Sequence, residues 1–319
     1  DEMYFASFWS EMPELNFDNP KVRSEIKDIA KYWLDLGVDG FRIDAAKHVY
    51  DINEYPKGTP VLTKNLEWFI EFNHYIKTVK EDAFLLLETW DNYNSVAHFL
   101  NGSDSAFNFD MGTAIISSVV SENRKSVQNT LTRIHNAYDK ITLDYVDSVF
   151  LANHDQDRVM SQLGGDVDKA KLAATIQFTL PGLSWIYYGE EIGMLGSKPD
   201  EDIREGFKWT SDQASAPNSR WRQWKHNLDT DALDMQMRDE TSMFEHYKGL
   251  TQLKATNDVI KKGSYLDYSI GTSFRLFAFY RQYEGETYLV IHNLHGQGKA
   301  LTLEDEDATL VFATQESTL

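Results

Sequence analysis

The first forty residues combine a helical spacing of apolar side chains with a short strand-like segment. Residues 20–36 place Val, Ile, Trp and Leu at three- and four-residue intervals, which predicts a helix. Asn19 before Pro20 suits the start of that helix, and Gly37 suits its end. The apolar segment 38–44 then predicts a buried strand.

The same alternation repeats along the chain. Phe69, Phe72, Ile76 and Val79 fall on one face of a second predicted helix, and residues 84–88 form the next strand-like run. Further strands are predicted at 106–109, 146–152 and 184–188, with helices at 111–137 and 168–180 between them. Near-continuous apolar strands separated by helices indicate a parallel sheet covered on both faces, the α/β class.

The pattern changes after residue 197. Residues 197–231 are polar and rich in Trp, which predicts a long surface loop, and residues 243–254 predict a helix. From about residue 262 the apolar period becomes two, with Glu284-Gly285 as a turn between two strands. Positions 274, 276, 278 and 280 precede this turn, and 288, 290 and 292 follow it. This end of the chain is predicted to be a small antiparallel β domain.

Charge and composition exclude several functions. The chain has 319 residues, 31 basic and 50 acidic, and a net charge of −19, which argues against nucleic acid and anionic membranes as partners. It has no Cys, so disulfides, thiolate metal sites and cysteine nucleophiles are absent. No run is long and apolar enough to suggest membrane insertion, and residues 1–5 do not resemble a signal peptide.

Three acidic residues occupy equivalent places in the pattern. Asp44 and Glu88 end predicted strands, and Asp155 follows a third. A carboxylate at the C-terminal end of a barrel strand points into the mouth of the barrel, where active sites lie. An isolated acidic residue at a strand end is more often a helix cap or an ion-pair partner. The assignment of a catalytic role therefore depends on the neighbouring residues.

Those neighbours resemble the motifs of the α-amylase family of glycoside hydrolases. The matching stretches are Gly-Phe-Arg-Ile-Asp-Ala-Ala-Lys-His at 40–48, Leu-Glu-Thr-Trp at 87–90, Phe-Leu-Ala-Asn-His-Asp at 150–155, Met-Pro-Glu-Leu-Asn at 12–16 and Ile-Tyr-Tyr-Gly-Glu-Glu-Ile-Gly at 186–193. They occur in the family's order, and the resemblance spans nearly the whole chain. Leu87, where many relatives have Gly, and the long interval between the first two carboxylates depart from the family pattern.

The resemblance implies a retaining mechanism with a separate role for each carboxylate. Asp44 would attack the anomeric carbon, Glu88 would protonate the leaving oxygen, and Asp155 would stabilise the oxocarbenium-like state, with His154 beside it. Arg42 lies on the same strand face as Asp44 and would hold it ionised. Negative charge near Glu88 would favour its protonated form.

The flanking residues indicate an α-glucan substrate. Lys47 and His48 are the pair that family members acting on α-1,4 polymers place beneath the sugars, and Trp90 is a candidate for stacking on a sugar ring. Four other tryptophans, at positions 9, 209, 221 and 224, could stack on sugars or pack beneath their own loops. We therefore expect cleavage of internal α-1,4 bonds in starch, glycogen or maltooligosaccharides. An α-glucosidase, a transglycosylase and a non-catalytic α-glucan-binding protein remain alternatives.

The family fold is a (β/α)8 TIM barrel, of which only the C-terminal five βα units are recognisable. Residues 1–16 are expected to end the domain inserted after the third strand, 17–260 to form the C-terminal part of the barrel, and 261–319 to form a β-sandwich. The family's first motif is missing, so an upstream half of the same barrel is expected. That half would supply most ligands of a structural calcium, to which this chain adds the backbone carbonyl of His48. The substrate class suggests an extracellular protein.

Overall fold

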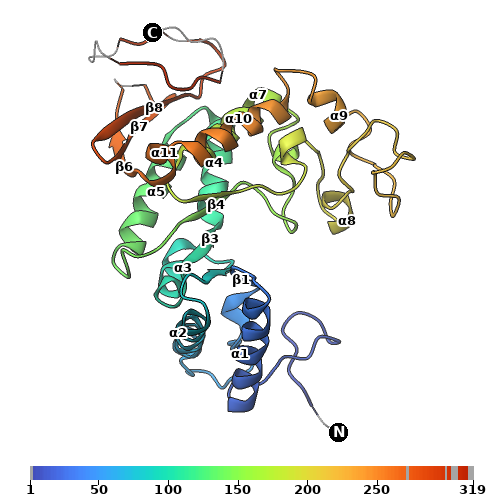
Figure 1. Ribbon diagram of the computed structural model, residues 1–319, viewed down its shortest axis with the longest axis vertical. Helices are drawn as coiled ribbons and strands as arrows, with labels where there is room; N and C mark the ends of the chain where they lie inside the picture. The colour runs from blue at the N-terminus through green and yellow to red at the C-terminus, as the bar shows by residue number, and fades with distance from the viewer. Residues whose placement is uncertain (1–2, 271–272, 299, 303–307, 315–319) are drawn as a thin grey trace. The chain divides into compact units, whose positions relative to one another are not determined.

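The predicted alternation of strands and helices is present in the computed structural model, which describes residues 3–270, 273–298, 300–302 and 308–314. Five strands lie in one sheet in chain order. They are β1 (Gly40–Ile43), β2 (Phe84–Leu87), β3 (Ser105–Asn108), β4 (Ser148–Phe150) and β5 (Leu183–Trp185); β1, β3 and β4 are labelled in Figure 1. The pairs β1–β2 and β2–β3 are parallel. The α/β class is thereby confirmed.

The register of β1 and β2 places two of the candidate carboxylates at one edge of the sheet. Ile43 lies opposite Leu87, and these are the last residues of their strands. Asp44 and Glu88 follow directly, so they leave the sheet side by side.

The chain divides into two compact units. The first contains Asp1–Phe109 and Thr132–Ser148, and the second contains Asp110–Leu131 and Val149–Leu319. The C-terminal strands therefore belong to the same unit as the later barrel helices. The predicted domain boundaries after residues 16 and 260 stay predictions.

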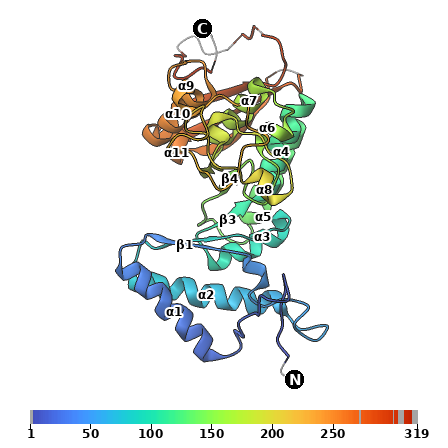
Figure 2. The same ribbon diagram turned by 90° about the vertical axis from the view of Figure 1, so that its right-hand side faces the viewer.

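Two long helices cover the sheet in the first unit. Helix α1 (Pro20–Asp35) is capped by the Asn19 side chain, and Gly37 after it has φ of +98°, as its pattern predicted. Helix α2 (Val61–Val79) packs beside α1 (Figure 2). Its buried face includes Trp68, Phe69, Phe72 and Ile76. Helix α3 (Tyr93–Phe99) and the 3-10 turns η1 (Ala46–His48) and η2 (Leu100–Gly102) complete the elements that precede β3.

The single helix predicted over 111–137 is wrong, because the chain forms two helices there. Helix α4 (Phe109–Ser121) ends and α5 (Lys125–Tyr138) begins around Glu122, whose φ of +51° lies in the left-handed region. Asn123 then accepts a hydrogen bond from the backbone N–H of Lys125 and starts the new helix. Residues 121–126 are all polar, and with Asn123 as a helix cap they were a local signal of the break that the prediction did not use.

The second unit is built around helix α7 (Val167–Thr179), which packs along α10 (Met243–Thr256). Figures 1 and 2 both show these helices side by side. Shorter elements precede them, lie between them or follow them in the sequence: α6 (Val159–Gln162), η3 (Glu190–Ile192), α8 (Asp200–Ile203), α9 (Leu233–Gln236) and α11 (Asp258–Lys262).

A three-stranded antiparallel sheet follows α11. Its strands β6 (Ser264–Tyr268), β7 (Leu276–Tyr283) and β8 (Glu286–Asn293) are paired in chain order. The predicted turn is present, with positive φ at Glu284 and Gly285. Strand β6 was not predicted, and four consecutive residues of β7, Leu276 to Phe279, are buried, so the period-two pattern was incomplete.

A buried arginine anchors this sheet to α7. Arg281 on β7 donates hydrogen bonds to the carbonyl oxygens of Thr179 and Gly263. The Thr179 carbonyl lies in the last turn of α7, where no partner within the helix exists. Since a buried carbonyl without a partner is costly, Arg281 stabilises the junction between helix and sheet.

Among the described residues, no helix is long and apolar enough to cross a membrane.

Candidate active site

Glu88 and Asp44 differ in exposure although they lie at neighbouring strand ends. Glu88 is 7% exposed, and its backbone N–H donates to the Ile43 carbonyl at 2.9 Å. Its own carbonyl accepts from the N–H of Ala46 at 2.8 Å. The Asp44 side chain is 72% exposed. The strand ends thus hold one shielded and one open carboxyl group.

Arg42 connects these two carboxyl groups. It lies two residues before Asp44, so both side chains leave β1 on the same face. One terminal nitrogen of its guanidinium forms an ion pair with Asp44, and the other forms an ion pair with Glu88. The predicted link between Arg42 and Asp44 is present, and the same cation also binds Glu88.

The surroundings of Glu88 raise its pKa above the usual value. Burial is the largest cause, and the charge of Asp44 and a hydrogen bond with its side chain act in the same direction. The N–H of Ala45 and the charge of Arg42 oppose them. A raised pKa keeps Glu88 protonated to higher pH, as a proton donor requires.

Ala45 has a backbone conformation that the sequence did not reveal. Its φ of 44° and ψ of 43° lie in the left-handed region, which is unfavourable for residues other than Gly. This conformation turns its N–H toward the Glu88 carboxylate at 3.3 Å. Strained residues of this kind cluster at functional sites.

Lys47 and Trp90 lie beside the carboxyl pair. The ammonium of Lys47 donates to the Trp90 carbonyl at 2.7 Å and lies 3.3 Å from an Asp91 carboxylate oxygen. The Trp90 ring stacks on Phe109 with 4.7 Å between centroids and is 47% exposed. One face of Trp90 is therefore supported by a second ring, as a stacking surface requires.

His48 is held on two sides. Its Nδ1 lies 2.5 Å from a carboxylate oxygen of buried Asp51, and its ring meets Phe8 edge-on at 5.2 Å. The carbonyl predicted as a calcium ligand is a single oxygen, whereas calcium takes six to eight. No cluster of three His, Asp or Glu side chains suited to a metal occurs in the described part of the chain. These residues alone do not form a calcium site, and calcium stays a prediction.

Asp155 and His154 belong to the second unit. An Asp155 carboxylate oxygen accepts from Arg204 at 2.7 Å, and the other lies 3.2 Å from His154 Nε2. Arg204 also donates to the His154 carbonyl at 2.8 Å and pairs with Asp200 at 3.0 Å. Sequence reasoning missed Arg204, which lies 49 residues away. The approach of Asp155 to Asp44 and Glu88 stays a prediction.

Arg158 closes the motif that contains Asp155, and its role was also missed. It is fully buried, its N–H donates to the Gly196 carbonyl, and its guanidinium donates to the Tyr188 carbonyl at 2.6 Å. The guanidinium also stacks over the rings of Tyr187 and Tyr188 at 4.7 and 4.8 Å. A Cβ at Gly189 would come within 2.8 Å of it. This packing fixes the end of the loop that holds Asp155.

The tryptophan candidates separate into two groups. Trp224 is 6% exposed, and its Nε1 donates to the Gly206 carbonyl at 2.8 Å, so it packs beneath its own loop. Trp9, Trp209 and Trp221 are exposed, as Trp90 is. Only the exposed four retain a surface on which a sugar ring could stack.

Comparisons with known proteins show the family of the chain. Residues 1–263 match the family model for the α-amylase catalytic domain, and residues 276–319 match the model for the C-terminal domain of α-amylase SusG. The chain is 43% identical to Alpha-amylase 3 of Dictyoglomus thermophilum over 92% of its own length and 57% of that protein. It is 31% identical to a 4-alpha-glucanotransferase of Thermotoga maritima, over 92% of its own length and 63% of that protein.

A solved structure has the same fold. The α-amylase from H. orenii superposes with a TM-score of 0.81 at 36% identity, over 90% of this chain and 57% of that one. The chain thus spans less than two thirds of the relatives that it matches. Because the catalytic-domain model matches residues 1–263 of the 319, the chain belongs to the α-amylase family.

Proposed function

We propose that this chain supplies the nucleophile and the general acid of a retaining glycosidase that cleaves internal α-1,4 bonds in α-glucans. The observation that supports this most directly is the single guanidinium of Arg42 shared by Asp44 and Glu88. The shielded Glu88 has the raised pKa of a proton donor, and the exposed Asp44 is open to a substrate.

The closeness of the two carboxyl groups favours retention. Inverting enzymes keep their carboxyls roughly 6.5–9.5 Å apart, so that a water molecule fits between sugar and base, whereas retaining enzymes hold them about 5 Å apart. Asp44 and Glu88 both form ion pairs with the one guanidinium of Arg42, which suits the shorter separation. In the proposed sequence Asp44 attacks C1 as Glu88 protonates the leaving oxygen, and Glu88 then takes a proton from the water that releases the sugar.

We assign Asp155 to stabilisation of the oxocarbenium-like state and His154, beside it, to substrate binding. Lys47 and His48 would lie beneath the sugars on the leaving-group side, and Trp90 would stack on a ring. Transfer to a second sugar uses the same residues, and a 4-alpha-glucanotransferase is among the relatives. Hydrolysis and transfer are therefore two candidate outcomes of one site.

The direct test is activity of the full-length protein on maltoheptaose and soluble starch. We expect Asp44→Asn and Glu88→Gln each to reduce kcat by about a thousandfold or more, because removal of a nucleophile or acid has effects of that order. Exposed Glu240→Gln serves as a matched control with unchanged kcat. NMR of the first products should find the α-anomer, and longer products would indicate transfer. A β-anomer, or either variant with near wild-type rate, would refute the assignment.

We further propose that an upstream half of the barrel completes this site and brings most of the calcium ligands. One face of α1 supports this, since Ile29, Tyr32, Trp33 and Leu36 are apolar and exposed. We expect residues 1–319 alone to be insoluble or inactive, and starch cleavage by this chain alone would contradict the proposal. Loss of thermal stability on chelation would support calcium, and export to the medium would support an extracellular location.

A further inference from the structure

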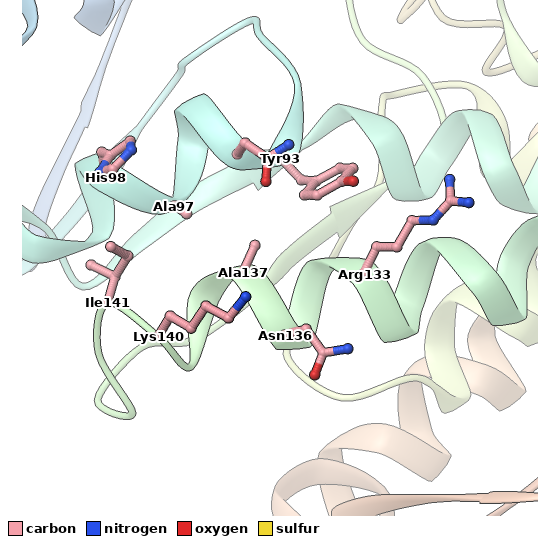
Figure 3. Close-up of a pocket in the computed structure, with 9 residues that line it drawn as sticks. Tyr93, Ala97, His98, Arg133, Asn136, Ala137, Lys140 and Ile141 are labelled. Atoms are coloured by element: carbon pink, nitrogen blue, oxygen red, sulfur yellow. The ribbon is translucent and has the colours of Figure 1, made fainter.

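A groove on the first unit has no part in the proposed catalysis. It lies between α3 and the C-terminal part of α5 and has a volume of about 340 Å³ (Figure 3). Ala97 and Ala137 contribute only methyl groups, which leave the space between the helices open. Figure 3 shows Tyr93 and Arg133 at one end, with His98 and Ile141 at the other.

The polar groups of α5 and of the turn after it reach the groove from one side. Asn136 and Ala137 are three and four residues after Arg133 on the helix, and Lys140 follows in the turn. His98 reaches the groove from α3. Two cations and an imidazole therefore line one cavity.

In the part of the chain that the structure describes, the side chains of Arg133, Lys140 and His98 make no hydrogen bond or ion pair. The acidic neighbour of Lys140, Asp139, accepts a hydrogen bond from Tyr145 instead. Many other cations of this acidic chain are paired, as Lys27 is with Glu71.

The lining determines which kind of ligand fits. No acidic residue is among the nine that line the groove, although the chain has 50 acidic residues. Arg and Lys offer only hydrogen-bond donors, which suit a ligand made of acceptors. A neutral sugar presents hydroxyl groups that donate as well as accept, so it gains less from this lining than an oxyanion does.

We propose that the groove between α3 and α5 binds a phosphate group, free or as the ester of a small molecule. Arg133 and Lys140 would contact the phosphate oxygens, with the Asn136 amide and His98 as further donors. This proposal does not rest on the catalytic one, because none of these residues is part of the carboxyl pair or its neighbours.

Calorimetric titration of the full-length protein tests the proposal, with inorganic phosphate, glucose 6-phosphate and maltotriose as separate probes. For inorganic phosphate or the ester we expect saturable binding with a dissociation constant on the order of 1 mM, weakened by added salt. Arg133→Ala with Lys140→Ala should weaken binding by about tenfold or more, since charge-assisted hydrogen bonds are lost. Arg238→Ala with Lys261→Ala, two exposed cations elsewhere, should leave it unchanged.

A second measurement locates the ligand. The ring signals of His98 in the NMR spectrum should shift on addition of phosphate in the wild type but not in the Arg133/Lys140 double variant. Because these side chains lie at the surface, the double variant should unfold at the wild-type temperature. No saturable phosphate binding, or equal binding of phosphate by the two double variants, would overturn the proposal.

Discussion

Two regions of this protein place an arginine near a buried glutamate, and they use the pair differently. In the first unit Arg42 is partly exposed and forms ion pairs with both Glu88 and Asp44. In the second unit Arg158 is fully buried and stacks on two tyrosine rings, while nearby Glu190 is 4% exposed. Burial is the largest cause of a raised pKa in both glutamates.

The difference shows that a raised pKa does not by itself identify an acid catalyst. Glu88 shares the Arg42 guanidinium with the exposed carboxylate of Asp44, where a substrate can approach. Glu190 has the buried Tyr247 and the carboxylate Glu191 as neighbours, and Arg158 lowers its pKa less than burial raises it. We infer that the first region serves catalysis and the second serves stability. The predictions below test that division.

The largest expected effect is loss of the shared cation. Arg42→Ala should reduce kcat/KM by about a hundredfold or more, because both carboxyl groups lose the group that orients them. Since the charge of Arg42 lowers the pKa of Glu88, its removal should also move the alkaline limb of the pH profile to higher pH. Steady-state kinetics across pH measure both changes. The Arg42→Lys variant should recover part of the rate. A wild-type rate and pH profile in Arg42→Ala would contradict a catalytic role for this arginine.

The corresponding change in the second region should affect stability. Arg158→Met removes the hydrogen bond to the Tyr188 carbonyl and the cation–π contacts with the two tyrosine rings, so unfolding should become easier by about 1–3 kcal/mol. Urea denaturation of the full-length protein measures this change, with Lys261→Met as an exposed control. A stable Arg158→Met protein with reduced kcat would place Arg158 in catalysis instead.

The pH dependence of stability should report Glu190. Because its pKa is raised well above 4.5 in the folded protein, the folded state keeps a proton that the unfolded chain has released. Below the pKa that Glu190 has in the unfolded chain, this group therefore contributes its full stabilisation. That contribution is lost as the pH rises toward the pKa that Glu190 has in the folded protein. In the Glu190→Gln variant, the free energy of unfolding should fall less steeply with rising pH above about pH 5. Equal slopes in thermal melts of the two proteins would contradict the assignment.

The smallest expected effect concerns the strain beside Glu88. Ala45→Gly should relieve the left-handed conformation and raise the free energy of unfolding by up to about 1 kcal/mol. Greater freedom of the N–H that faces Glu88 should at the same time reduce kcat slightly. Chemical denaturation and kinetics on one preparation measure the two changes. Lower stability in Ala45→Gly would show that the conformation carries no strain.

Much of the fold and half of the site could be predicted because the signals are local. Residues close together in the sequence indicate the caps of α1 and the apolar face of α2. They also indicate that Asp44 and Glu88 lie at strand ends. The break between α4 and α5 was missed although residues 121–126 are all polar and Asn123 is a suitable helix cap. The left-handed conformation of Glu122 became visible only in the structure.

The remaining contacts join residues that are distant in sequence. Arg204 binds Asp155 across 49 positions, and Arg281 binds the Thr179 carbonyl across 102. Each arginine has several acceptors of suitable chemistry along the chain, and no local pattern chooses among them. The fold determines the partner, because a charged side chain that is removed from water binds an acceptor that packing brings within reach.

By itself, the sequence determined the α/β class, the three motifs with their carboxylates and the resemblance to the α-amylase family. Only the tertiary structure decided that one guanidinium joins Asp44 to Glu88, that Ala45 is left-handed, and that Trp224 is buried while Trp90 is exposed. The physical reason is that residue type and spacing set what a side chain can do, whereas burial and neighbours set its charge and its access to substrate.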